Sequence, residues 1–138
     1  GYCIMSSHIH LIARAEGVYT LSDILRDFKK YTSKEIIKRI LSEPESRRDW
    51  MIEYFRKAGE NLKGIKDYKF WQDGNHAEEI SSNRFFDEKL DYIHNNPVQE
   101  LLVERPEDYF FSSARNYAGL NCYLDIILES VKQRSTSW

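Results

Sequence analysis

The chain contains little cysteine, no long apolar run and no excess of positive charge. Its 138 residues include two cysteines, Cys3 and Cys122, which lie far apart and form no Cys-x-x-Cys pair, so we expect reduced thiols and no cysteine metal site. No apolar stretch is long enough for a membrane span, and the start carries no basic region followed by an apolar run. These absences exclude a membrane protein and predict a cytoplasmic one.

The composition favours one globular domain. With 41% hydrophobic and 14% aromatic residues, the chain is large enough to bury a core of its own. Residues 2–5 and 11–13 are apolar and flank the polar pair Ser6-Ser7, which predicts two short strands joined by a tight turn. Helical spacing of apolar residues follows over most of the remaining chain. We therefore predict an α+β fold with a small antiparallel sheet covered by helices.

Two histidines stand one residue apart in His8-Ile9-His10, where the second strand opens. Side chains alternate along a strand, so both imidazoles should lie on one face and Ile9 on the other. Two neutral imidazoles on one face supply half of a metal site. Taken alone, the motif also fits two histidines that merely occupy a sheet surface.

Residues 90–98 predict the last turns of a helix that begins after Ser81-Ser82 and is stopped by Pro97. Tyr92 should project beside the apolar face of this helix, toward a neighbouring strand, with Asn96 one turn further on the same side. A tyrosine is a plausible nucleophile mainly where a metal ion polarises an electrophile such as a phosphodiester. Taken alone, Tyr92 also fits an amphipathic core residue. His94 should point roughly away from Tyr92, which favours a structural or solvent-exposed role.

Several blocks of the chain together resemble the single-tyrosine HUH transposases, and most closely the REP-associated tyrosine transposases, which are IS200-like. The resemblance runs from about the first residue to Tyr117. It is carried by His8-Ile9-His10, the basic segment Asp27-Phe28-Lys29-Lys30-Tyr31-Thr32-Ser33-Lys34, Phe70-Trp71-Gln72, Asp91-Tyr92-Ile93-His94-Asn95-Asn96-Pro97-Val98 and residues 104–117.

The resemblance implies a chemistry for individual positions. His8, His10 and Asn96 match the residues that hold a divalent cation, Mg²⁺ or Mn²⁺, and Tyr92 matches the nucleophile. The tyrosine of such enzymes attacks a phosphodiester in single-stranded DNA and forms a 5′-phosphotyrosine link and a free 3′-hydroxyl. The implied partner is hairpin-forming single-stranded DNA, and the implied site of action is the bacterial nucleoid.

The resemblance also implies a ferredoxin-like HUH endonuclease fold in a single domain over residues 1–138. Relatives carry a further strand and helix before the segment that begins here, and the chain starts at Gly1 without methionine, so we expect an N-terminally truncated domain. A monomer and a homodimer both stay open, as do a tyrosine acting on its own subunit and one acting on a partner.

The charge is unevenly distributed although its sum is −2. Residues 21–41 carry six basic and three acidic side chains on one predicted helix, which Thr20 and Asp23 should cap, whereas residues 73–108 carry three basic and ten acidic ones. This asymmetry suggests that nucleic acid meets one face only. We predict four DNA-binding residues on the basic helix: Arg26, Lys29, Lys30 and Lys34.

Two further segments are predicted as packing elements. A second helix should bury Trp50, Met51, Tyr54, Phe55 and Ala58 and end before Gly59. Residues 65–72 are rich in aromatics and predict a strand, in which Phe70 or Trp71 could stack on a base, although core packing is the safer assignment.

Two other functions remain open besides strand transfer through Tyr92. The chain could be a nucleic-acid-binding domain of the same fold without turnover. It could also be a metal-dependent phosphodiesterase in which the histidines activate water instead of tyrosine.

Overall fold

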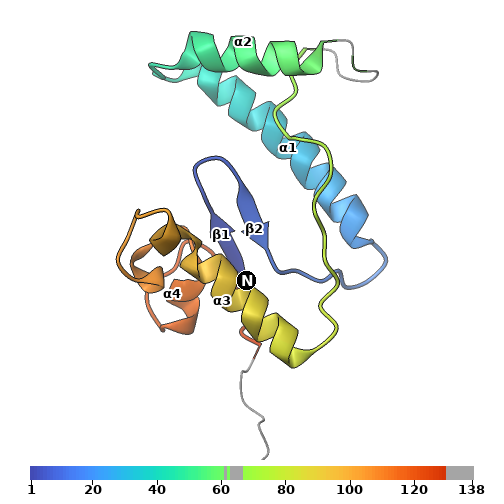
Figure 1. The fold of residues 1–138 in the computed structure, drawn as a ribbon. Helices are drawn as coiled ribbons and strands as arrows, with labels where there is room; N and C mark the ends of the chain where they lie inside the picture. Colours follow the sequence, from blue (N-terminus) through green and yellow to red (C-terminus); the bar gives the residue numbers. More distant parts are fainter. Residues whose placement is uncertain (61, 63–66, 130–138) are drawn as a thin grey trace, which may run out of the picture. The chain divides into compact units, whose positions relative to one another are not determined.

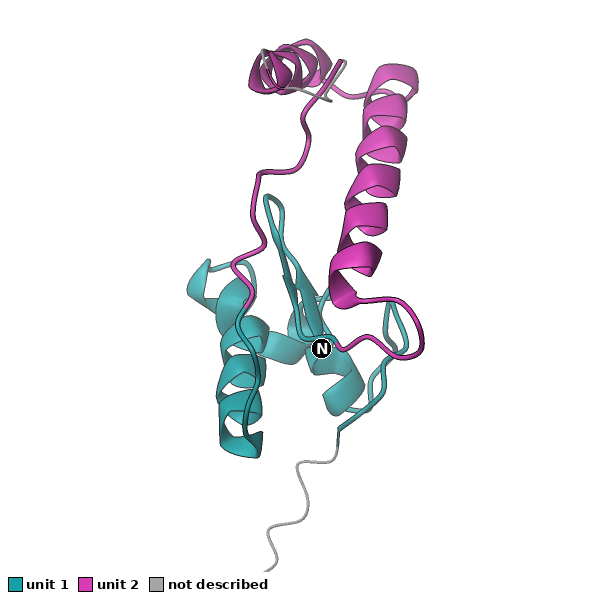
Figure 2. Ribbon diagram, turned by 90° about the vertical axis from the view of Figure 1, so that its right-hand side faces the viewer, with its two compact units in different colours: residues 1–13, 78–138 teal, residues 14–77 magenta. Residues whose placement is uncertain are grey.

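The protein divides into two compact units in the computed structural model, which describes residues 1–60, 62 and 67–129. Unit 1 contains residues 1–13 and 78–138, and unit 2 contains residues 14–77 (Figure 2). The described part has a small two-stranded antiparallel sheet and four α-helices, which confirms the predicted α+β class. The single transposase-like domain and the ferredoxin-like topology stay predictions.

The sheet of unit 1 joins β1 (Tyr2–Ile4) to β2 (Ile9–Leu11), with Cys3 opposite His10 (Figure 1). The backbone N–H of Met5 donates to the carbonyl of His8 at 2.9 Å and closes the turn around Ser6-Ser7. The predicted hairpin is therefore confirmed, with His8 just before β2 and His10 inside it.

The second edge of β1 is paired with a segment more than one hundred residues away in sequence. Ile4 N–H donates to Phe111 O and Ser113 N–H donates to Tyr2 O, both at 2.9 Å, and Cys3 forms an antiparallel bridge with Ser112. β1 thus lies between β2 and residues 111–113. This position explains why Cys3 has no exposed surface.

Helix α3 (Asn83–Gln99) packs against this sheet and supplies half of the core. Ser82 caps it by accepting a hydrogen bond from Phe85 N–H at 3.2 Å, as residues 81–82 predict. The buried side chains of Leu90 and Ile93 meet those of Cys3 and Met5. Short elements complete the unit: η1 (Pro106–Asp108) and α4 (Ala114–Tyr117).

Pro97 does not end α3, contrary to the prediction. Proline removes one backbone donor, yet the helix continues because the N–H of Glu100 still reaches Asn96 O at 3.0 Å. The chain leaves the helix at Leu101, whose φ of 58° lies in the left-handed region.

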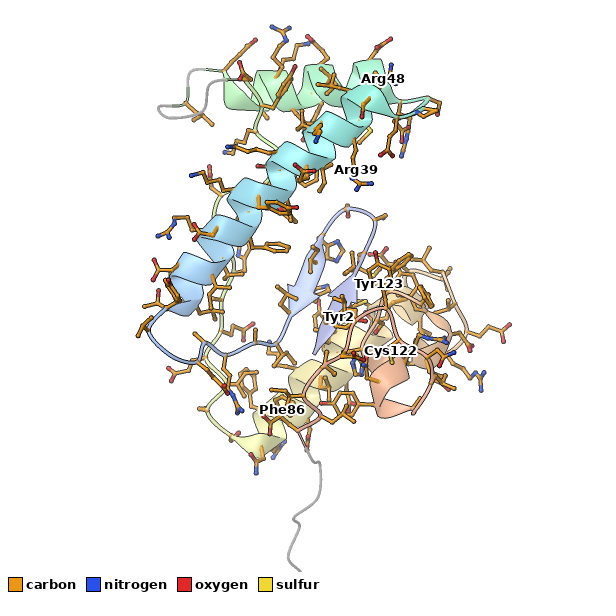
Figure 3. All side chains as sticks on the ribbon, turned by 180° about the vertical axis from the view of Figure 1, so that it is seen from behind. Tyr2, Arg39, Arg48, Phe86, Cys122 and Tyr123 are labelled. Atoms are coloured by element: carbon orange, nitrogen blue, oxygen red, sulfur yellow. The ribbon has the colours of Figure 1, made fainter. Side chains whose placement is uncertain are left out.

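Unit 2 is built on a helical hairpin of α1 (Leu21–Ser42) and α2 (Arg48–Gly59). Thr20 and Asp23 form the predicted capping box at the start of α1. Arg48 connects the two helices, because its Nε donates to Ile40 O at 2.8 Å and a terminal nitrogen donates to Glu43 O at 2.6 Å (Figure 3).

The prediction for the buried face of α2 is wrong in part. Trp50 and Tyr54 are 66% and 57% exposed, and Ala58 is exposed as well. The contacts of Arg48 with α1 fix the rotation of α2, so the residues that follow Arg48 at helical spacing face inward. These inward positions are Ile52, Phe55 and Gly59, with Met51 beside them.

Residues 67–72 form no strand, which corrects that part of the prediction for 65–72; residues 65 and 66 lie outside the described residues. The segment is instead attached by side chains. Trp71 Nε1 donates to Thr32 Oγ1 at 2.9 Å, and the ring of Phe70 packs on that of Phe55 with centroids 5.1 Å apart. Phe70 and Trp71 therefore pack against the two helices of unit 2 and are half-buried.

Within the described ranges, no helix is both long and apolar enough to cross a membrane.

Candidate active site

The two histidines lie on the sheet face that α3 covers. Residues directly opposite each other in an antiparallel pair project on the same face, and His10 is opposite Cys3, which packs against α3. His8 lies opposite Met5, another core residue. Both imidazoles are half-buried, at the end of the core nearest the turn.

The two imidazoles converge through one nitrogen each. His8 Nε2 and His10 Nε2 are 3.0 Å apart, and the rings meet edge to face with centroids 4.7 Å apart. The other nitrogen of His8, Nδ1, lies 3.1 Å from Ser7 Oγ. When Nδ1 carries the proton and donates to this hydroxyl, the lone pair of His8 Nε2 faces His10.

Two residues of α3, Tyr92 and Asn96, lie beside the histidine pair. The ring of Tyr92 contacts that of His10 edge to face, with centroids 5.6 Å apart, and half of its surface is exposed. Asn96 is 8% exposed, and its Nδ2 donates to Tyr92 O at 2.9 Å. The amide nitrogen therefore donates to the helix backbone, and Oδ1 is the atom of Asn96 that can accept from His10.

The environment lowers the pKa of His10. Burial is the larger cause, and the nearby charge of His8 acts in the same direction, while a hydrogen bond with Asn96 and the charge of Glu100 partly offset them. His10 is therefore neutral at pH 7. A neutral imidazole keeps the lone pair that a metal ion needs.

The residues present fit a divalent cation. Two ligands at about 2.1 Å from an ion and at about a right angle lie about 3.0 Å apart, which is the separation of His8 Nε2 and His10 Nε2. Asn96 offers an amide oxygen beside His10. Among the described residues, no group of three His, Cys, Asp or Glu side chains gathers to hold a metal. Imidazole nitrogen with amide oxygen suits manganese and other transition ions better than magnesium.

His94 lies apart from this cluster, in the core of unit 1. Its Nε2 is 2.8 Å from Ser113 Oγ, and only 8% of the residue is exposed. Burial, together with the nearby amino terminus, lowers the pKa of His94 to about 4. The predicted structural role of His94 is confirmed.

The four predicted DNA-binding residues all lie on α1, in unit 2. Arg26 is paired with Asp23 and Asp27 at 2.7 and 3.0 Å. The Lys29 ammonium donates to Gln72 O and Gly74 O at 3.3 and 3.0 Å, which attaches that segment to the helix. Lys30 and Lys34 are exposed and make no ion pair with any described residue.

The structure adds two residues that the sequence analysis did not single out. Ser7 was assigned only to the turn, and nothing in its sequence signals a bond to His8 Nδ1. Lys38 lies one turn beyond Lys34 on α1, so its position could have been recognised from the spacing alone.

Comparison with models of known families, with curated proteins and with solved structures finds no match for this chain, and the resemblance to the single-tyrosine HUH transposases stays a prediction.

Proposed function

We propose that the protein nicks and rejoins single-stranded DNA through Tyr92. The observation that carries the proposal is the convergence of Tyr92 on a histidine pair, with its ring 5.6 Å from that of His10 and the two Nε2 atoms 3.0 Å apart. Sequence spacing alone could not bring residues 8–10 and 92–96 together. The ferredoxin-like HUH fold belongs to the same proposal.

The reaction exchanges one phosphodiester for another. Tyr92 Oη attacks the phosphorus, the bond from phosphorus to the 3′-oxygen breaks, and the DNA end becomes a 5′-phosphotyrosine. The phenol loses its proton and the departing 3′-oxygen gains one, so the proton count balances. A later attack by a 3′-hydroxyl on the phosphotyrosine restores the phenol. No bond energy is lost, so no nucleotide cofactor is required.

His8, His10 and Asn96 would hold the divalent cation. When bound, the cation supplies Lewis-acid stabilisation of the charge that develops on the scissile phosphate and orients that group. The neutral state of His10 and the position of the Asn96 amide oxygen beside it support this assignment. Tyr92 is 50% exposed, which leaves its hydroxyl open to a polymeric substrate.

The test is covalent capture. The protein is incubated with a labelled hairpin-forming single strand and Mn²⁺ or Mg²⁺, and a denaturing gel is examined for a DNA-linked protein band. We expect a band that requires the metal and disappears in Tyr92→Phe, which keeps the ring and removes the nucleophilic oxygen. Tyr123→Phe is the matched control, since Tyr123 is 55% exposed and lies in the same unit.

Two results would contradict the proposal. Cleavage without a protein adduct that survives in Tyr92→Phe would identify a hydrolase that activates water. Binding on a native gel with no covalent product on any hairpin would identify a DNA-binding domain without turnover.

A further inference from the structure

We propose that the outward side of α1 is a binding surface for single-stranded DNA, formed by Lys30, Lys34, Lys38 and Tyr31. The inference rests on the proposed function for the kind of nucleic acid, and it assigns phosphate and base contacts to unit 2. We call these four residues the α1 row.

Three lysines of the row are unpaired cations. Lys30, Lys34 and Lys38 are exposed, and none of their ammonium groups forms an ion pair or a hydrogen bond within the described part of the chain. Successive members lie four residues apart, so their ammonium groups follow one side of the helix for about 12 Å. Unpaired cations at regular spacing suit a polyanion, because no internal partner has to be displaced.

Other basic residues of α1 are already engaged. Arg26 is held by Asp23 and Asp27, and Arg39 lies 3.4 Å from Glu43. Lys29 donates to two backbone carbonyls of residues 72–74. The basic residues of α1 that remain available to phosphate groups are therefore the three lysines of the row.

Tyr31 adds a group that favours single strands. It is 68% exposed, follows Lys30 directly and precedes Lys34 by one turn, and its ring contacts no other ring among the described residues. An exposed aromatic ring beside phosphate-binding cations stacks on an unpaired base. The bases of a duplex are already stacked on one another, so this contact is lost for double-stranded DNA.

The distribution of charge favours the same surface. Unit 2 has 14 basic and 11 acidic residues, a net charge of +3, whereas unit 1 has 6 basic and 11 acidic residues, a net charge of −5. A nucleic acid backbone is attracted to the first and repelled by the second. Glu35 is the acidic residue closest to the row in sequence that has no ion pair, and it is half-buried.

The test measures binding without cleavage. The affinity of the full chain for a labelled oligothymidine of about 15 nucleotides is measured by fluorescence anisotropy in EDTA, over a range of salt concentrations. We expect Lys34→Gln and Lys38→Gln each to reduce the slope of log affinity against log salt by about 0.7. Arg39→Gln removes the same charge from the same helix, but from a paired residue, and should leave the slope unchanged.

Two substitutions of Tyr31 test the stacking contact separately from the phosphate contacts. Tyr31→Ala should weaken binding of the single strand by about 10-fold or more, and Tyr31→Phe should retain it. Tyr19→Ala is the control, since Tyr19 is also 68% exposed in unit 2. Circular dichroism of each variant establishes that the helices are intact.

Equal slopes for Arg39→Gln and Lys34→Gln, or full affinity in Tyr31→Ala, would overturn the α1 row. These failures are distinct from failure of the strand-transfer proposal. An adduct at Tyr92 with unaltered binding in the row variants rejects only the row. Impaired binding in the row variants without any adduct rejects only the chemistry.

Discussion

Ser7 holds one ring of the candidate site with a single hydroxyl. Its Oγ lies 3.1 Å from His8 Nδ1, and when Nδ1–H donates to this oxygen the lone pair of Nε2 faces His10. We expect Ser7→Ala to weaken Mn²⁺ binding by up to about 10-fold, measured by isothermal titration calorimetry, because the ring loses the partner that selects its tautomer.

Ser6 provides the matched control for Ser7. It occupies the same turn, is exposed, and forms no hydrogen bond among the described residues, so Ser6→Ala should bind Mn²⁺ as the wild type does. Equal losses in the two variants would show that the turn, and not the tautomer, determines affinity.

His94 makes the stability of unit 1 depend on pH. Its pKa is about 4 in the folded protein and about 6.5 in the unfolded chain, so the unfolded chain binds the proton first as the pH falls. Above pH 6.5 protonation of His94 leaves the free energy of unfolding unaffected. As the pH falls from 6.5 toward 4, protonation of the unfolded chain lowers this free energy progressively, by up to about 3 kcal/mol. Urea unfolding at a series of pH values in the absence of divalent ions measures it.

The control for this pH dependence is a pair of glutamine substitutions. His94→Gln should flatten the dependence between pH 6.5 and 4, although it also lowers stability at neutral pH through the altered contact with Ser113. His76→Gln, at an exposed position, should retain the wild-type dependence. An unchanged dependence in His94→Gln would assign it to other groups.

Local patterns predicted the side of its own element on which each residue lies, whereas the meeting of the two elements was expected only from the family resemblance. The alternation of strand side chains correctly put His8 and His10 on one face, and helical spacing correctly put Tyr92 and Asn96 on one side. That these two pairs share a site depends on which face of the sheet α3 covers. That choice follows from the burial of Cys3, which local sequence does not encode.

At the scale of elements, strong local signals predicted well and weak ones failed. α1 begins where the capping box indicates, and the β1–β2 hairpin turns at the polar pair Ser6-Ser7 between two apolar runs. The predicted buried side of α2 was wrong in part. Trp50 and Tyr54 are large and apolar, and for that reason alone the prediction assigned them to the core. Arg48 donates to the carbonyls of Ile40 in α1 and of Glu43 just after it, and these contacts, which no local pattern reveals, lie on the side of α2 that is turned inward.

At the scale of the whole molecule, unit 1 is discontinuous and unit 2 is a single inserted segment. Nothing in the sequence marks this division, because residues 13–14 and 77–78 carry no linker-like composition. The pairing of β1 with residues 111–113 is likewise a long-range contact, which propensities cannot anticipate.

This arrangement predicts a contrast in hydrogen exchange across the sheet. Ile4 N–H donates to Phe111 O and Ser113 N–H donates to Tyr2 O, so both groups lie between β1 and residues 111–113 and should exchange only when unit 1 unfolds. The ladder alternates, and its hydrogen-bonded pair is Cys3 with His10, so the N–H groups of Ile9 and Leu11 point away from β1.

Exchange followed by NMR should therefore show slow Ile4 and Ser113 and fast Ile9 and Leu11. Protection of Ile9 and Leu11 equal to that of Ile4 would contradict an open outer edge on β2. Protection of these two residues that rises with protein concentration would instead indicate that a second chain covers the edge.

The long-range pairing of β1 also affects how the protein is made. The histidine strand leaves the ribosome well before residues 111–113, so β1 acquires its second neighbour only when that later segment has emerged. Until then Cys3 and the backbone of Tyr2 lack the partners that bury them. A nascent chain with both histidines and Tyr92 already synthesised therefore still lacks one neighbour of the strand on which the candidate site is built.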